Sequence, residues 1–218
     1  MKATARGKSR IRATPQQRRR LAAAMAVDTL SAATASPLVR RVLVVAEDES
    51  DAAAVGALPG VEVRLTATTE LNAAILDGLS LLRPEEGPVA VLPADLPGLD
   101  PDDLTRVLEL CAHLVFAVVP DRSGSGTTIL TGRRTTDVNP AYGLSSFARH
   151  QAAGAVPVAV PARSTVRADV DTLAEALACG GMHTMAVLAE FAPVAGATAA
   201  ARGRSDQVDG SHRWVPGS

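Results

Sequence analysis

Six short apolar runs alternate with segments of helical pattern along most of this chain, and no other feature restricts its fold as much. Each run is predicted to be a strand; together they cover residues 41–46, 61–65, 88–92, 114–119, 127–131 and 156–160. The predicted helices cover residues 15–35, 70–82, 145–153, 173–178 and 184–191, with a short alanine-rich helix ending at residue 58 and another starting at residue 100. Strands and helices that alternate at this spacing are typical of βαβ units. The sequence therefore predicts an α/β fold with a mostly parallel sheet and helices on both of its faces.

The starts of two of these helices are marked by capping residues. Asp100 stands in the N-cap position before Pro101, and further aspartates fill the first turn. Thr172 and Glu175 have the three-residue spacing of a capping box. We therefore expect helices to begin directly after Asp100 and Thr172.

Composition narrows the class of protein. A chain of 218 residues with 47% hydrophobic residues can bury one good-sized core, but with 2% aromatic residues Ala, Val and Leu must fill it. The net charge of −1 argues against a protein that binds nucleic acid or a membrane over its whole surface. Cys111 and Cys179 lack CxxC spacing and a His/Cys cluster, which indicates free thiols in a reducing compartment. No apolar run is long enough to span a membrane, so we expect a cytoplasmic protein.

One domain is expected over residues 1–192. Residues 193–218 are rich in Ala, Gly, Ser, Arg and Asp without periodicity, which predicts a disordered tail. We expect deletion of this tail to leave the activity of the protein unchanged. A large loss of activity would show instead that the tail belongs to the fold or to the site.

Carboxylates at the ends of apolar segments are the first candidates for a site. Asp95 follows the run 88–92, and Pro97 prevents that strand from continuing. Asp169 and Asp171 are two residues apart, so on extended backbone both face the same side and could share a cation. Each could instead be an ordinary turn or cap aspartate, which is the more frequent case for a single motif. The presence of all three carboxylates favours a metal site.

Two further segments could bind an anion. The loop 120–128 contains two glycines that allow backbone N–H groups to converge on a phosphate, but it lacks the P-loop lysine and could equally be a hairpin turn. In the segment 142–150, Ser145 or Ser146 at a helix start could form a second anion pocket, or simply cap the helix. His150 is expected to be a surface or packing histidine.

The N-terminal segment is strongly basic. Residues 1–20 hold eight cations and no acid. This composition fits a transit peptide or solvated arm, a nucleic-acid-binding tail, or a loop that holds a triphosphate. Composition alone favours the solvated arm.

Seven short motifs are specific when taken in their order, although each alone is common. They are Lys2-x5-Lys8-Ser9-Arg10, Met25-x2-Asp28-Thr29-Leu30, Leu71-Asn72-x-Ala74-Ile75, Asp95-Leu96-Pro97, Pro120-Asp121-x3-Ser125-Gly126-Thr127-Thr128, Tyr142-Gly143-x2-Ser146-x3-His150 and Asp169-Val170-Asp171-Thr172. This ordered set resembles the 2-phospho-L-lactate/phosphoenolpyruvate guanylyltransferase family of coenzyme F-420 biosynthesis. The resemblance runs from about residue 2 to about residue 192.

The resemblance implies a Rossmann-like, glycosyltransferase-A-type nucleotidyltransferase fold, similar to that of molybdenum-cofactor nucleotidyltransferases. It also implies a Mg²⁺-dependent transfer of GMP from GTP to the phosphate of a small phosphorylated carboxylic acid, with release of pyrophosphate. By their positions in the motifs, the catalytic metal ligands are expected to be Asp95, Asp169 and Asp171. The residues expected to bind the acceptor carboxylate are Thr127, Gly143 and Ser146. Those expected to bind the nucleotide are Lys2, Lys8 and Arg10 at the phosphates, with Asn72 as a candidate at the guanine.

One departure from the family concerns the first strand. Family members begin with an apolar strand ahead of the lysine loop, whereas Met1 stands directly before Lys2 here. The first, central strand of the nucleotide half is therefore expected to be missing. Its absence would leave the neighbouring strands with unpaired backbone groups and the helices with exposed apolar faces.

The resemblance favours phosphoenolpyruvate as acceptor over 2-phospho-L-lactate, with phosphoglycerate as a third candidate. Two alternatives stay open: another nucleotidyltransferase of the same fold, and a catalytically impaired binding paralogue. A nucleic-acid-binding module is disfavoured because aromatic residues that could stack on bases are nearly absent. The sequence leaves the oligomeric state open.

Overall fold

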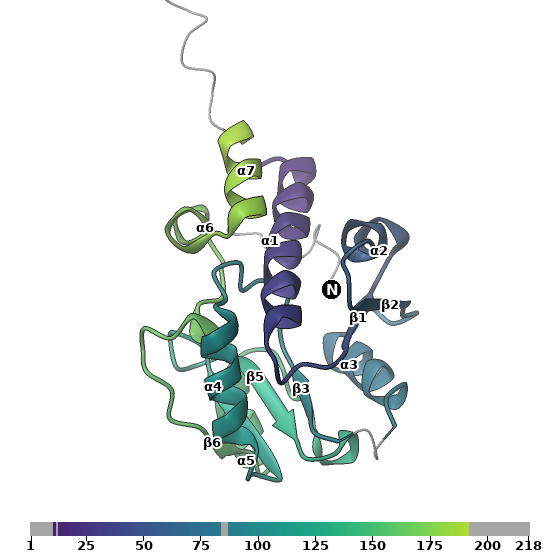
Figure 1. The fold of residues 1–218 in the computed structure, drawn as a ribbon, viewed down its shortest axis with the longest axis vertical. Coiled ribbons are helices and arrows are strands. Elements are labelled where there is room, and N and C mark those ends of the chain that lie inside the picture. The colour runs from purple at the N-terminus through teal and green to yellow at the C-terminus, as the bar shows by residue number, and fades with distance from the viewer. Residues whose placement is uncertain (1–10, 12, 84–86, 192–218) are drawn as a thin grey trace, which may run out of the picture.

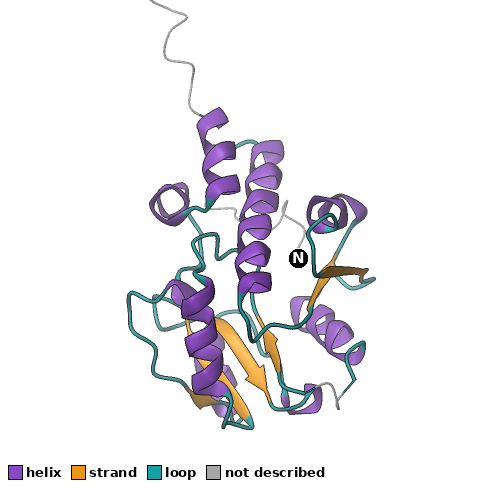
Figure 2. Cartoon of the chain, in the orientation of Figure 1, coloured by secondary structure: helices purple, strands orange, loops and turns teal. Residues whose placement is uncertain are grey.

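The computed structural model describes residue 11 and residues 13–83 and 87–191. Seven helices are assigned in this part of the chain: α1 (Pro15–Ala35), α2 (Glu49–Val55), α3 (Leu71–Ser80), α4 (Pro101–Cys111), α5 (Ser146–Ala152), α6 (Leu173–Cys179) and α7 (Met182–Phe191). The strands assigned there are β1 (Val42–Ala46), β2 (Val61–Leu65), β3 (Val89–Val91), β4 (Phe116–Pro120), β5 (Thr127–Gly132) and β6 (Val156–Pro157). Two 3₁₀ turns, η2 (Thr135–Asp137) and η3 (Thr165–Arg167), complete this set. Strands and helices thus alternate as the sequence predicts (Figures 1 and 2).

The strands form two sheets. β1 and β2 pair in parallel, while the second sheet has the order β3-β5-β4-β6. In the second sheet β5 runs antiparallel to both β3 and β4, and β6 runs parallel to β4. The α/β class is confirmed, but the sheet is mixed rather than mostly parallel. The physical reason is the short connection 121–126 between β4 and β5, because a parallel pair needs a crossover of a dozen residues or more.

The helix caps lie where the sequence predicts them. Asp100 accepts a hydrogen bond from the backbone N–H of Asp103, and Pro101 is the first residue of α4. Thr172 and Glu175 form the expected reciprocal capping box at the start of α6. These helices are therefore started by local interactions that the sequence alone encodes.

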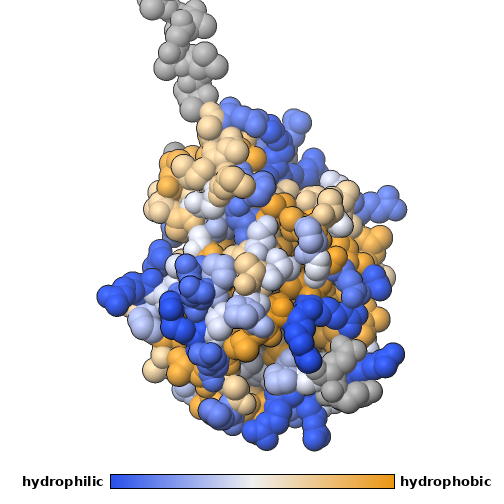
Figure 3. Space-filling model, viewed as in Figure 1, coloured by the Kyte–Doolittle hydropathy of each residue, from blue (hydrophilic) through white to orange (hydrophobic). Residues whose placement is uncertain are grey.

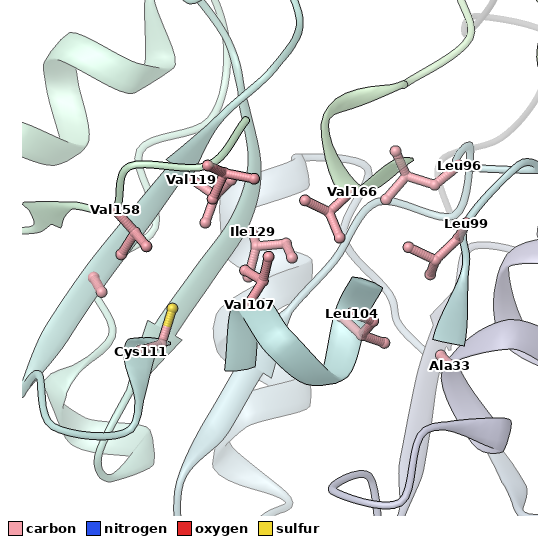
Figure 4. Close-up of a cluster of buried hydrophobic side chains, with 12 residues drawn as sticks. Ala33, Leu96, Leu99, Leu104, Val107, Cys111, Val119, Ile129, Val158 and Val166 are labelled. Carbon is pink, nitrogen blue, oxygen red and sulfur yellow. The ribbon is translucent and has the colours of Figure 1, made fainter. Parts of the chain in front are cut away.

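Small aliphatic side chains fill the core, as the composition requires. One cluster lies between α4 and the four-stranded sheet, where Leu104, Val107 and Cys111 pack near Ile129 and Val119 (Figure 4). Burial of Cys111 raises the pKa of its thiol. Neither cysteine forms a disulfide, in agreement with the expected free thiols.

A hollow of about 1230 Å³ separates the two sheets. Consecutive residues line it on both sides, 40–45 at β1 and 87–95 at β3. Because successive side chains of a strand point to opposite faces, a space that touches them all lies along the strand's edge. Apolar side chains of α1, α3 and α4 also line the hollow. The hollow therefore has the surroundings of one further strand. The absence of the first strand stays a prediction.

Figure 3 shows apolar residues reaching the surface on the side of the molecule that carries α2, β1 and α3. Leu65, Leu71 and Leu76 are among the large apolar side chains exposed in the described structure. No helix in the described ranges combines the length and apolar character needed to cross a membrane. The expected tail, residues 193–218, lies outside the described residues.

Candidate active site

The two segments that carry the three predicted carboxylates lie side by side. The backbone N–H of Val170 donates a hydrogen bond to the carbonyl oxygen of Asp95 at 3.0 Å. This contact places the segment 169–171 against the loop that follows β3, although the two are far apart in the sequence. Asp95 and Asp171 both line the hollow between the sheets, whereas Asp169 is outside the set of residues that line it. The structure thus brings two of the three predicted carboxylates to one space.

The backbone at Asp171 is held by the neighbouring helix cap. The Glu175 carboxylate accepts hydrogen bonds from the backbone N–H groups of Asp171 and Thr172, each at 2.8 Å. A carboxylate that accepts two backbone N–H bonds holds a turn firmly, because both bonds are charge-assisted. The capping box and the site segment are therefore one local structure.

The loop at Asp95 is held by α1. The Thr29 hydroxyl accepts a hydrogen bond from the backbone N–H of Leu96 at 3.0 Å and donates one to the carbonyl of Met25 at 2.8 Å. Leu96 itself is fully buried. Thr29 belongs to a motif that carries no site role in the sequence predictions, so its tie to the Asp95 loop is new information from the structure.

The neighbouring Asp28 fastens α7 to α1. Its carboxylate accepts hydrogen bonds from the backbone N–H groups of His183 at 3.0 Å and Thr184 at 2.8 Å, and pairs with the His183 ring nitrogen Nδ1 at 2.9 Å. Gly181 lies so close that a Cβ there would come within 2.5 Å of the Asp28 carboxyl carbon. Asp28 and Thr29 therefore connect the first described helix to the last one and to the Asp95 loop.

We expect Thr29→Val to lower the free energy of unfolding by about 1–3 kcal/mol, because it leaves the buried N–H of Leu96 without its acceptor. The measurement is urea unfolding of the variant and of Thr29→Ser, which retains the hydroxyl. A Thr29→Val protein as stable as the Thr29→Ser protein would contradict this assignment.

The donor set at the hollow is compatible with Mg²⁺. This ion is typically held by one or two protein carboxylates together with substrate phosphates and water. Asp95 and Asp171 supply two carboxylate residues that line the same hollow. Over the described part of the chain, no three side chains of His, Cys, Asp or Glu are gathered into a metal cluster. The role of Asp169 as a third ligand stays a prediction.

The glycine-rich loop between β4 and β5 is a closed hairpin. The Asp121 carboxylate accepts hydrogen bonds from the Ser125 backbone N–H at 3.1 Å and from the Ser123 hydroxyl. The Asp121 N–H donates to the Gly126 carbonyl at 3.0 Å. The loop thus joins the antiparallel strands β4 and β5, and its Ser125 N–H already binds an internal carboxylate. The hairpin alternative is therefore the right one.

The three residues predicted to bind the acceptor carboxylate do come from segments that meet. The Phe147 N–H donates to the Ser125 carbonyl at 3.2 Å, which joins the start of α5 to the hairpin that precedes Thr127. The Ser146 N–H donates to the Gly143 carbonyl at 3.1 Å, and Gly143 has a φ of +127° that side chains rarely tolerate. The segments of Thr127, Gly143 and Ser146 therefore form one region, and their binding role stays a prediction.

His150 is a buried component of this region that the site prediction does not include. The ring has no solvent exposure, so the expectation of a packing histidine is correct as far as burial goes. Both ring nitrogens are engaged, one with the Thr127 hydroxyl at 2.9 Å and one with the Ala141 backbone N–H at 2.8 Å. The motif spacing alone does not reveal these contacts.

Asn72 contacts the same region. Its side-chain oxygen accepts a hydrogen bond from the Tyr142 N–H at 2.8 Å, and its NH₂ group donates to the Tyr142 carbonyl at 3.1 Å. The amide thus clamps the loop beside Gly143. Its predicted role at the guanine stays a prediction, and the other predicted nucleotide residues, Lys2, Lys8 and Arg10, lie outside the described residues.

The stability of the fold should depend on pH through His150. Burial, with a smaller contribution from the charge of Arg149, lowers the pKa of His150 from 6.5 to about 4. Between these two pKa values the unfolded chain binds a proton that the folded chain does not. The contribution of His150 to the free energy of unfolding is therefore complete above pH 6.5 and is lost as the pH falls towards 4. We expect a loss of about 3 kcal/mol over this window. The measurement is urea unfolding at several pH values between 4 and 6.5. The free energy of unfolding of His150→Phe should depend correspondingly less on pH over this range.

Comparison with known proteins gives the family of the chain. Residues 1–156 match the model of a family described as guanylyl transferase CofC like. A phosphoenolpyruvate guanylyltransferase of Streptomyces coelicolor is 43% identical over 199 residues, which cover 88% of this chain and 94% of that protein. The phosphoenolpyruvate guanylyltransferase of Streptomyces avermitilis is 41% identical over 200 residues, with 88% and 92% covered.

Solved structures share the fold at low sequence identity. A protein of Desulfovibrio desulfuricans G20 named as a nucleotide-diphospho-sugar transferase matches with a TM-score of 0.56 and 14% identity, covering 77% of each chain. A homologue of the Mycobacterium tuberculosis protein Rv0371c, from Mycobacterium sp. strain JC1, matches with a TM-score of 0.54 and 18% identity over 76% of this chain and 84% of its own. These matches confirm the Rossmann-like nucleotidyltransferase fold, and the family model and the curated relatives together show that the chain belongs to the CofC-like guanylyl transferase family.

Proposed function

We propose that this protein transfers GMP from GTP to the phosphate of phosphoenolpyruvate and releases pyrophosphate, in the biosynthesis of coenzyme F-420. The observation that carries the proposal is the hydrogen bond from Val170 to Asp95, because it brings Asp95 and Asp171 to the same hollow. The relatives named phosphoenolpyruvate guanylyltransferase support this choice of acceptor. The nearly isosteric 2-phospho-L-lactate is the second candidate. A cytoplasmic location belongs to the same proposal.

In this reaction an oxygen of the acceptor phosphate attacks the α-phosphorus of GTP, and pyrophosphate leaves. Such a transfer depends on positioning and charge neutralisation more than on a protein nucleophile. When bound, Mg²⁺ would neutralise the charge on the phosphates, and Asp95 and Asp171 would hold it, with Asp169 as the proposed third ligand. The proposed positions of Lys2, Lys8 and Arg10 are at the GTP phosphates.

The acceptor is held by the second region in this proposal. Thr127, Gly143 and Ser146 bind its carboxylate, and the Asn72 clamp on Tyr142 keeps the loop at Gly143 in place. This division assigns the phosphate chemistry to the loops at Asp95 and Asp171 and the recognition of the acid to the loop 141–146.

The test is pyrophosphate release by the purified protein with GTP and Mg²⁺, comparing phosphoenolpyruvate, 2-phospho-L-lactate and 3-phosphoglycerate in parallel. We expect release that depends on phosphoenolpyruvate and stops when EDTA is added. Pyrophosphate release with only a different acceptor would assign that acceptor as the substrate. Pyrophosphate release that persists in EDTA would contradict the metal dependence.

The hollow between the sheets favours one second candidate, a binding paralogue with impaired catalysis, because the predicted absence of a strand there would leave the nucleotide half incomplete. Silence with all three acceptors, together with retained GTP binding, would support that candidate. Repeating the assay on a protein that supplies a strand to the hollow then separates an incomplete enzyme from a non-catalytic one.

A further inference from the structure

The hydrogen bonds of His150 fix which of its nitrogens carries the proton. The Ala141 backbone N–H can only donate, and it donates to Nε2 at 2.8 Å. Nε2 is therefore the unprotonated nitrogen, and a neutral ring must carry its proton on Nδ1. Nδ1 lies 2.9 Å from the Thr127 hydroxyl oxygen. His150 thus donates to Thr127 rather than accepting from it.

This direction leaves the Thr127 proton for another partner. A hydroxyl has one proton to donate and two lone pairs with which to accept. Since His150 already donates to one of the lone pairs, the Thr127 O–H can donate elsewhere. Burial keeps the ring neutral, because it lowers the pKa of His150 to about 4, so this arrangement holds at neutral pH.

The ring is itself held in place from several sides. His150 lies on α5, the edge of the Tyr142 ring meets it with centroids 4.9 Å apart at 74°, and Asn72 in turn clamps the Tyr142 backbone. Because the ring has no solvent exposure, water does not compete for either nitrogen. The direction of the Thr127 hydroxyl is thus set by a network that joins β5, α5 and the loop 141–143.

We propose that His150 is a positioning residue that turns the Thr127 hydroxyl into a hydrogen-bond donor for the carboxylate of the acceptor. The inference rests on the proposed function, which assigns Thr127 to that carboxylate. A carboxylate only accepts hydrogen bonds. A Thr127 hydroxyl that donated its hydrogen bond to His150 would therefore present only lone pairs to the negative charge of the acceptor. His150 therefore acts on acceptor affinity through Thr127 without touching the acceptor.

The test is a pair of substitutions, each of which retains the hydrogen bond of only one of the two His150 ring nitrogens. The amide NH₂ of His150→Asn reaches the position of Nδ1 and can still donate to Thr127, whereas the amide oxygen of His150→Gln reaches the position of Nε2 and can still accept from Ala141. Phosphoenolpyruvate binding is measured by calorimetry in the presence of Mg²⁺ and a GTP analogue with a methylene group between the α- and β-phosphates. We expect His150→Gln to raise the Kd for phosphoenolpyruvate about tenfold and His150→Asn to remain nearer the parent protein.

A double-substitution cycle with Thr127→Val measures whether the effect of His150 on the Kd for phosphoenolpyruvate depends on the Thr127 hydroxyl. A merely structural role of His150 would not produce this dependence. We expect the double variant Thr127→Val/His150→Gln to bind phosphoenolpyruvate no more weakly than Thr127→Val alone, with the Kd for the GTP analogue within about twofold throughout. Additive effects, or equal losses for His150→Asn and His150→Gln that follow the melting temperature, would overturn the positioning role. Failure of the parent protein to bind phosphoenolpyruvate would overturn the proposed function itself, and this inference with it.

Discussion

Asp171→Asn is expected to lower kcat/KM for pyrophosphate release by roughly a hundredfold or more, because it removes a negative charge at the proposed metal site without changing the shape of the side chain. Substitutions of residues that only support metal ligands already cost about 10–100-fold. The backbone at Asp171 is held by Glu175, so the turn should survive the substitution. Steady-state kinetics at several Mg²⁺ concentrations measure the loss, and part of the activity should return at high Mg²⁺.

Asp102→Asn is the matched control for this prediction. Asp102 is an exposed carboxylate in the first turn of α4, and its substitution changes the net charge by the same amount. We expect it to keep full activity. Asp171→Asn with normal Mg²⁺-dependent turnover would count decisively against the metal site, and the same assay on Asp169→Asn decides whether a third ligand exists.

An apolar extension ahead of residue 1 is expected to raise the melting temperature by about 10–20 °C. Native interiors rarely contain voids larger than a water molecule, so an apolar hollow of about 1230 Å³ between two strand edges has much to gain from being filled. Six β-branched residues would bury their side chains there and pair with both strands. After the entropy of ordering these residues is subtracted, the free energy of unfolding rises by about 5 kcal/mol. For a domain of this size each kcal/mol raises the melting temperature by about 2–4 °C.

The geometry at the start of the described chain makes this extension feasible. Ile11 is buried in one cluster with Val170, and Val170 is bonded to Asp95 at the end of the hollow. Ten extended residues span at most about 33–36 Å, which sets the reach of a chain that precedes Ile11. The measurement is thermal unfolding followed by circular dichroism, together with hydrogen exchange of the β1 and β3 amides.

A glycine-serine extension of equal length is the control, since it adds the same number of residues without apolar side chains. It should leave both the melting temperature and the exchange rates unchanged. Equal melting temperatures for the two extended proteins would show that the hollow does not accept a strand.

The helix starts and the candidate carboxylates could be predicted because they depend on short-range patterns. Asp100 and Thr172 cap helices with residues three positions away, so their environment is contained in the local sequence. Asp95, Asp169 and Asp171 were identified by their places in motifs, and the structure brings their segments together. The roles of Lys2, Lys8 and Arg10 lie outside the described residues and stay predictions.

Long-range contacts decided the features that were predicted wrongly or not at all. The sequence predicted a mostly parallel sheet, but β5 turns back on β4 because the loop between them is short and closed by Asp121. Thr29 and Asp28 hold segments far away in the chain, and no local pattern reveals such partners. The contact of the Asn72 amide with the Tyr142 backbone was likewise not predicted, and its role at the guanine stays a prediction.

The sequence by itself determined the alternation of strands and helices, the caps and the family, because apolar periodicity, capping residues and ordered motifs are local properties of a chain. Only the tertiary structure decided the strand directions, the space shared by Asp95 and Asp171, and the proton position on His150. These depend on which distant groups meet once the chain is packed. A backbone N–H from Ala141 and a hydroxyl from Thr127 determine the His150 tautomer, and their meeting is a consequence of folding rather than of sequence spacing.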